Sequence, residues 1–167
     1  RAANIVPRLR TLAMRALARM YRPEHQLFAF RLRPLVNEIV AEGLSPRYTA
    51  IALIGLAGEG DVASSTVLAG HTAREVCQRL AKELPHLESL GDVALVCWAA
   101  HAVSYPGSDS AWQRLLELGP AEGSHPVVDV AWALSALCAN EERQLDWLRE
   151  RLARRLIASL DPRSGLF

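Results

Sequence analysis

The side chains best suited to chemistry in this sequence stand at the starts of apolar helical runs. The segment "SPRYT" places Arg47 and Tyr48 in front of a stretch made almost entirely of small and branched apolar residues. A guanidinium buried without a partner is costly, so Arg47 has to meet a carboxylate, a carbonyl or an anionic ligand. The pair therefore indicates a site that orients an anionic or polar group.

Two carboxylates occupy early positions in later apolar runs. Asp92 follows a glycine, and Asp129 comes three residues after Pro126, between two valines. A carboxylate at a helix start accepts backbone N–H bonds and suits the helix dipole, so Asp92 is predicted to cap its helix. The same dipole argument applies to Asp129. Its apolar flanks also favour a protonated carboxyl, which makes it the candidate catalytic acid or base if it faces a cavity.

Aromatic and imidazole side chains lie further along the same runs. Trp98 and Trp132 come from successive apolar helices, and they either form an aromatic wall for an apolar ligand or a sugar ring, or pack in the core. His101, about one turn past Trp98, is predicted to be a hydrogen-bonded core histidine.

The cysteines indicate neither a metal site nor a disulfide framework. Cys77, Cys97 and Cys138 are an odd number and lack CxxC spacing. Buried, reduced thiols are the expected state. No residue pattern indicates a cofactor, so none is predicted.

The charges are distributed unevenly although the net charge is only +1. Residues 1–33 hold eight arginines and a single acid. Arg8, Arg15, Arg19 and Arg22 share one side of a predicted helix, which is either an anion site or a solvated helix edge. Nucleic acid is not an expected partner, because the overall balance is near neutral and no aromatic residues interleave with the arginines.

Hydropathy argues against a membrane span and for a cytoplasmic protein. No apolar stretch reaches the roughly 18 residues that a spanning helix needs. The first ten residues, "RAANIVPRLR", lack the apolar core of a signal peptide. We therefore expect a soluble domain over residues 1–167.

Two kinds of helix alternate along the chain. Runs from Tyr48, Asp92 and Val127 are apolar nearly all round, which is typical of helices buried on most sides. Between and after them come amphipathic runs, each with one apolar stripe, at residues 62–84, 110–119 and 141–160. Short breaks rich in Gly, Pro and Ser separate them, so the pattern predicts antiparallel helical hairpins.

One segment departs from helical periodicity. Phe28, Phe30 and Leu32 alternate with polar or small residues, a period of two that suits a short strand, and Pro34 can begin a turn. We expect one short β-hairpin near residues 27–42. Ser45 is then predicted to cap the next helix, with Pro46 in its first turn.

Taken together, these motifs resemble a known architecture. "LARMYRPEHQLFAF" followed by "SPRYTAIALIGLAG" is similar to the repeat of α/α toroids of the prenyltransferase and squalene-cyclase type. There a helix ends in a Pro/Gly turn that presents an aromatic residue, and a new inner helix follows. "DVAWALSALCA" resembles that inner helix again. Six-hairpin glycosidases and epimerases share the alternation and are the second choice.

The resemblance implies where a ligand would lie. Inner helices of a toroid expose one set of ends at the mouth of a central cavity. The resemblance therefore implies that the early residues of the inner helices face a ligand: Arg47, Tyr48, Asp92, His125 and Asp129. The departures concern catalysis: the sequence lacks the aspartate-rich motif of the terpenoid cyclases and the Asp, Cys and His trio of the zinc-dependent prenyltransferases. No pair of carboxylates of the glycosidase kind can be picked out from spacing.

An internal repeat predicts that this chain is part of a larger toroid. "YRPEHQLF" near the start and "LDPRSGLF" at residues 160–167 share Pro, Leu and Phe at the same spacing, which pairs Phe28 with Phe167. Two functions remain open. The complete toroid is an enzyme acting on a small molecule, isoprenoid or carbohydrate, or it is a non-catalytic helical-repeat module that binds a protein or a ligand.

Overall fold

The computed structural model describes residues 5–140 and 145–165, and this part of the chain is mostly helical. The predicted predominance of helices is confirmed. A short 3₁₀ helix, η2 (Leu84–His86), follows the fourth α-helix. The α-helices within the described residues are α1 (Ile5–Met20), α2 (Pro46–Leu56), α3 (Asp61–Val67), α4 (Ala73–Ala81), α5 (Leu90–Ala102), α6 (Asp109–Glu117), α7 (Val127–Ala139) and α8 (Asp146–Ser159).

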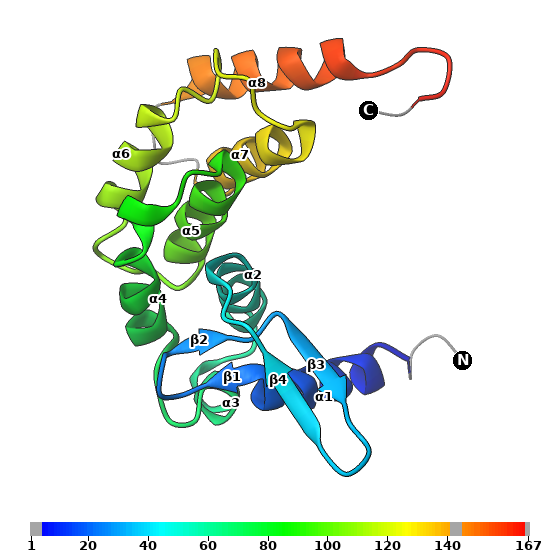
Figure 1. Cartoon of the computed structure of the whole chain (residues 1–167). Helices are drawn as coiled ribbons and strands as arrows, with labels where there is room; N and C mark the ends of the chain where they lie inside the picture. Colours follow the sequence, from blue (N-terminus) through cyan, green and yellow to red (C-terminus); the bar gives the residue numbers. More distant parts are fainter. Residues whose placement is uncertain (1–4, 141–144, 166–167) are drawn as a thin grey trace.

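The helices form an open arc of two layers (Figure 1). The apolar helices α2, α5 and α7 line its concave side, and the amphipathic helices α4 and α6 cover the convex side. Helix α8 forms one arm of the arc, and α1 with the strands forms the other. Helix α5 is central, because it packs against α2, α4, α6 and α7. No described helix is long and apolar enough to cross a membrane.

The apolar composition of the inner helices follows from this central place. Ala50 of α2, Ala94 of α5 and Ala133 of α7 are fully buried, as is Leu53. Small side chains allow the helix axes to approach closely, while the larger ones fill the space between the layers. Each large apolar side chain removed from water contributes about 1.5–3 kcal/mol.

The predicted amphipathic run 62–84 is not continuous, and this prediction was wrong. After α3 the backbone turns through Ala69 (φ 51°) and Gly70 (φ 94°), both in the left-handed region that ends helices. Thr72 then starts α4 through a capping box with Glu75. The predicted stripe is nevertheless buried at Val76, Cys77, Leu80 and Leu84.

The structure contains two small antiparallel hairpins, where one was predicted. Strands β3 (Arg31–Pro34) and β4 (Ile39–Glu42) form the expected hairpin within residues 27–42. Strands β1 (Tyr21–Arg22) and β2 (Leu27–Phe28) form a second, which the sequence analysis missed. Two-residue strands are too short to show a period of two.

The first hairpin is attached to the start of α2. The Phe28 N–H donates to Thr49 Oγ1 (2.9 Å), and Thr49 Oγ1 donates to the Ser45 carbonyl (2.7 Å). The predicted cap is confirmed, since Ser45 accepts from the Tyr48 N–H and Pro46 begins the helix. This network orients α2 relative to the strands.

Arginines of α4, α6 and α8 connect the helices through hydrogen bonds to backbone carbonyls. Each donates to backbone carbonyls of a connection or of an inner-helix end, where helix carbonyls lack partners. The pairs within the described residues are Arg74 with Val103, Arg114 with Leu87, Arg149 with Leu137 and Asn140, and Arg155 with Pro120 and His125.

Helix α1 packs mainly on α3 and has no buried residue. Arg8, Arg15 and Arg19 are exposed on it, which supports the solvated-edge interpretation of the arginine row. Arg22 lies beyond α1, in β1. The predicted repeat partner Phe167 lies outside the described residues, as does Leu166.

Two predictions about single side chains were wrong. His101 is exposed near the end of α5 and does not lie in the core. Cys138 is exposed near the end of α7, whereas Cys77 and Cys97 are buried as predicted. Both residues lie in the last turn of a helix that is apolar nearly all round, where the sequence pattern gives no sign of an exposed position.

Candidate functional site

The starts of the three inner helices lie close together. Arg47 of α2 forms an ion pair with Asp92 of α5 through Nε and Oδ1. The same guanidinium lies over the ring of Trp132 of α7, with Cζ 5.1 Å from the ring centroid. Four residues selected from the sequence, Arg47, Asp92, Asp129 and Trp132, therefore belong to one cluster.

Ser89, the N-cap of α5, joins the three helices through one hydroxyl. Its Oγ donates to Asp129 Oδ2 (2.9 Å), and it accepts from the Asp92 N–H (3.3 Å) and more distantly from Arg47 Nη2 (3.5 Å). The predicted role of Asp92 as N-cap was wrong, because Ser89 caps the helix and Asp92 sits in its first turn.

Sequence reasoning missed Ser89, although a signal was present. The segment Ser89-Leu90-Gly91-Asp92 has the spacing in which a serine caps a helix and an acid follows three residues later. Gly91 was also missed. A Cβ at Gly91 would lie 2.5 Å from Asp129 Oδ1 and 2.6 Å from Trp132 Cε3, so only glycine permits this approach of α5 and α7.

Electrostatics explain why these charges gather. Asp92 and Asp129 lie in the first turns of α5 and α7, where the helix dipole stabilises a carboxylate. Arg47 lies in the first turn of α2, where a cation is disfavoured, and the neighbouring acids compensate. The hydrogen bond from Arg47 to Asp92 raises the guanidinium pKa, burial opposes this, and the charges of Asp92 and Asp129 raise it further.

The charged residues of the cluster differ in how far they are buried. Asp129 is only 6% exposed, whereas the Arg47 and Asp92 side chains are 39% and 21% exposed. The buried carboxylate is therefore held by Ser89 inside the protein, while the ion pair reaches the surface. The cluster can offer N–H donors and carboxylate acceptors to a molecule on the concave side.

An aromatic and apolar face continues from the cluster along the inner helices. On α2 the exposed positions Tyr48, Ile51 and Gly55 follow a helical spacing, and Tyr48 is 48% exposed. Trp98 is half-buried on α5, two turns beyond Gly91, on the helix face that meets α7. We call Tyr48, Ile51, Trp98, Val128 and Trp132 the concave face.

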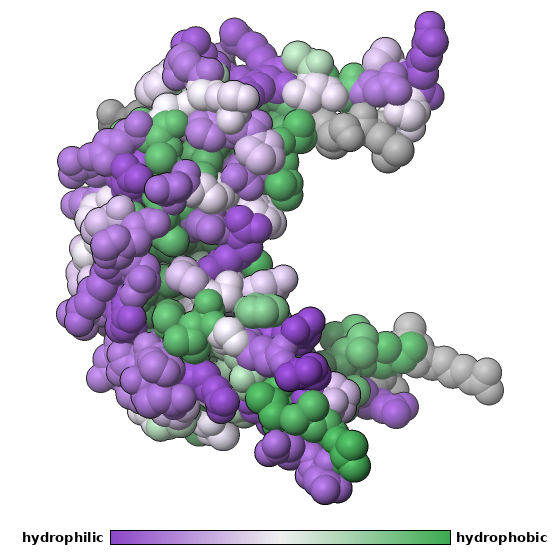
Figure 2. All heavy atoms as spheres, in the orientation of Figure 1, coloured by the Kyte–Doolittle hydropathy of each residue, from purple (hydrophilic) through white to green (hydrophobic). Residues whose placement is uncertain are grey.

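The distribution of hydropathy agrees with this description. Figure 2 shows hydrophilic residues gathered over the convex side, while hydrophobic residues appear along the inner edge near α7 and on the β3–β4 hairpin. An apolar surface turned towards a hollow, with polar groups at one end, is typical of a binding face.

His125 lies apart from the cluster. Its Nε2 is 3.0 Å from the Leu118 carbonyl, and its own carbonyl accepts from Arg155 Nη2 (3.3 Å). These contacts fasten the connection between α6 and α7, so the structure does not bring His125 to the other predicted ligand-facing residues. Across residues 5–140 and 145–165, no three His, Cys, Asp or Glu side chains are grouped to hold a metal ion.

Comparisons of the chain with protein families, with curated proteins and with solved structures find no match. The site is therefore interpreted from its own geometry.

Proposed function

We propose that this chain is part of an α/α toroid whose concave face binds a small molecule, and that the molecule is a carbohydrate. The observation that supports the proposal is that an aromatic surface adjoins a charged, hydrogen-bonding one. The exposed ring of Tyr48 and the half-buried ring of Trp132 lie beside the partly exposed Arg47–Asp92 pair. A sugar needs both surfaces, because its C–H faces pack on aromatic rings and its hydroxyls need donors and acceptors.

The second ligand class, an isoprenoid, fits this site less well. The diphosphate of an isoprenoid would need cations, and the Arg47 guanidinium is already paired with Asp92 and close to Ser89. An anion would have to displace Asp92, which would then lose its partner. A neutral polyol can instead add hydrogen bonds to the pair without breaking it.

The contacts of the cluster support binding more directly than catalysis. Asp92 holds Arg47, and Asp129 accepts from Ser89, so both carboxylates take part in joining helices. Catalysis by Asp129 stays a prediction. It requires that the buried carboxyl gain access to the bound molecule. The Asp129→Asn variant separates the roles, since a catalytic acid or base would lose turnover while binding is kept.

The test is a binding screen of the chain against oligosaccharides and against farnesyl diphosphate, followed by tryptophan fluorescence and calorimetry. We expect oligosaccharide binding that Trp98→Ala and Tyr48→Ala weaken by about 1–2 kcal/mol each, as for loss of a stacked aromatic contact. Trp147→Ala is the matched control, because Trp147 is an exposed tryptophan of α8 that takes no part in the Arg47 cluster.

Two results would overturn the proposal. In one, farnesyl diphosphate binds and the oligosaccharides do not. In the other, the Trp147 variant loses as much oligosaccharide affinity as the Trp98 and Tyr48 variants do.

A further inference from the structure

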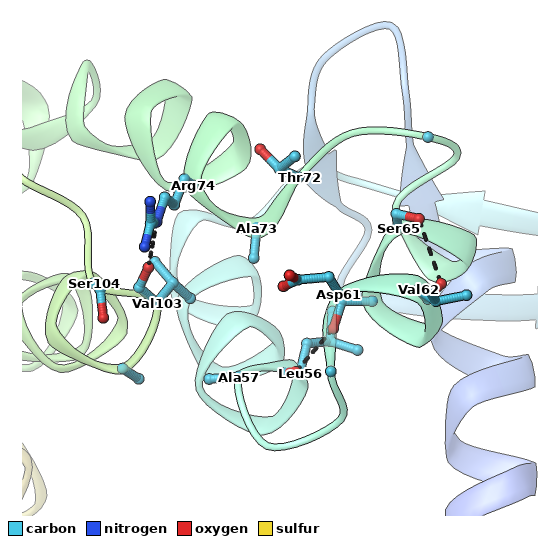
Figure 3. Close-up of a pocket in the computed structure, with 14 residues that line it drawn as sticks. Leu56, Ala57, Asp61, Val62, Ser65, Thr72, Ala73, Arg74, Val103 and Ser104 are labelled. Carbon is cyan, nitrogen blue, oxygen red and sulfur yellow. Dashed lines mark hydrogen bonds between the residues drawn. The ribbon is translucent and has the colours of Figure 1, made fainter.

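A separate cavity lies where α2 and α5 end, at the opposite ends of these two helices from Arg47 and Asp92. It has a volume of about 690 Å³. Figure 3 shows its lining residues. Its walls come from the end of α2 with the start of α3, the start of α4, and the end of α5. The size is within the range of small-molecule sites in proteins.

The cavity carries one anion and one cation on different walls. Asp61 of α3 points towards the start of α4, while Arg74 and Ser104 lie on the side of α5 (Figure 3). Within the described residues, no hydrogen bond or ion pair engages the Asp61 carboxylate. Arg74 Nε donates to the Val103 carbonyl (3.1 Å), and its terminal nitrogens donate to no described residue. Both groups therefore keep capacity for a ligand.

The lining of the cavity also includes apolar side chains, among them Leu56 of α2, Val62 of α3 and Ala102 of α5. A ligand in the cavity would meet a carboxylate, a guanidinium and apolar side chains. Arginine binds carboxylates in a planar, two-bond geometry, whereas an ammonium is a partner for Asp61.

Ser104 belongs to the cavity lining and lies in the turn that ends α5. It follows α5 with φ 51°, in the left-handed region, where glycine is the unstrained choice. The hydrogen bonds Ser104 N–H to the His101 carbonyl and Tyr105 N–H to the Ala100 carbonyl form the helix-ending turn. The hydroxyl has no partner among the described residues and lines the cavity.

We propose that this cavity binds a small zwitterion, an α-amino acid or a dipeptide with an aliphatic side chain. Its ammonium group pairs with Asp61, its carboxylate with the terminal nitrogens of Arg74 and the hydroxyl of Ser104, and its side chain with the apolar lining. The site shares no residue with the concave face, so each proposal can be refuted without affecting the other.

The first test compares probes that differ by one charged group. Calorimetry with the full chain is carried out with L-valine and glycyl-L-valine, and with isobutylamine and isovalerate, which keep the side chain and one charge each. We expect one zwitterion to bind at least 10-fold more tightly than either analogue, because each loses a charge-assisted hydrogen bond. Equal affinities, or no binding by either zwitterion, would overturn the proposal.

The second test uses substitutions that separate binding from folding. Asp61→Asn should weaken zwitterion binding by about 10- to 100-fold. It should lower the Tm by no more than about 2–4 °C, since Asp61 is exposed and its charge in the first turn of α3 contributes at most about 1 kcal/mol. Ser104→Gly relieves the left-handed strain and should raise the Tm by about 2–4 °C. It should nevertheless weaken binding by about 3- to 10-fold through the lost hydroxyl.

Ala69→Gly is the matched control for Ser104→Gly. Ala69 has the same φ of 51° but is not part of the cavity lining. The control should raise the Tm by a similar amount and leave binding unchanged. If Ser104→Gly raises the Tm and binding stays at the wild-type level, the hydroxyl has no role. If Asp61→Asn also binds normally, the assignment of the cavity is wrong.

Discussion

The close approach of α5 and α7 makes a sharp prediction for Gly91→Ala. The new methyl group would lie 2.5 Å from Asp129 Oδ1, 2.8 Å from Asp129 Cγ and 2.6 Å from Trp132 Cε3. Neither neighbour can withdraw freely, because Asp129 is held by Ser89 and the Trp132 ring lies against Arg47. One added carbon therefore has to push the two inner helices apart at their starts.

The magnitude follows from two opposing effects. Overpacking of a filled interior costs about 1–3 kcal/mol. Alanine gains at most about 1 kcal/mol over glycine in a helix. The net expectation is a destabilisation of about 1 kcal/mol, which lowers the Tm by about 2–4 °C in a domain of this size.

Gly55→Ala is the matched control, because the same atom is added to an inner helix in a different environment. Gly55 lies on α2, and no heavy atom stands within 4 Å of its added Cβ. This variant should be stabilised by about 0.5–1 kcal/mol. The difference between the two variants, measured by calorimetry and by urea unfolding, is then the overpacking cost.

The result that would refute this reasoning is a Gly91→Ala variant stabilised as much as Gly55→Ala. The starts of α5 and α7 would then stand further apart than described, and the cluster around Ser89 would not be closed.

Three further outcomes can be measured. A double-mutant cycle of Arg47→Met and Asp92→Asn should give a coupling of about 1 kcal/mol that shrinks in 1 M NaCl, and zero coupling would contradict the ion pair. Burial raises the pKa of the Cys77 thiol from 9.0 to about 12, and burial together with the nearby charge of Glu75 raises the pKa of Tyr21 from 10.0 to about 12. The unfolded chain releases these protons first, so unfolding free energy should fall as the pH rises from about 9 to 12. Cys77→Ala and Tyr21→Phe should each flatten that fall, and an unchanged slope in both would contradict the burial of these groups. A thiol reagent should modify the exposed Cys138 rapidly and the buried cysteines only on unfolding; fast reaction of all three thiols would contradict this burial.

Local patterns in the sequence were sufficient for much of the helical architecture. The apolar runs became α2, α5 and α7, and the cap at Ser45 followed from a serine before Pro46 at the start of an apolar run. These features depend on residues within one or two turns of each other. The break at residues 68–72 was missed because it replaces a few residues of an otherwise regular apolar stripe.

The candidate site could be predicted only residue by residue. Arg47, Asp92, Asp129 and Trp132 each stood out by type and position, and Arg47 was expected to need a partner. The partner of Arg47 could not be predicted from the sequence, because Asp92 is 45 residues away. The same holds for the hydrogen bond from Ser89 to Asp129, whose residues are 40 positions apart. His125 looked equivalent in the sequence but faces the α6–α7 connection.

The sequence by itself determined where the inner helices lie and which residues form the apolar stripes of the outer ones, since hydrophobic periodicity and caps are local properties of the chain. The tertiary structure alone decided that three helix starts meet, because this depends on which helices become neighbours across the arc. It also decided that Gly91 is a point of contact, and that Asp61, Arg74 and Ser104 line one cavity. No local pattern encodes such meetings, because they are set by packing between residues far apart in the chain.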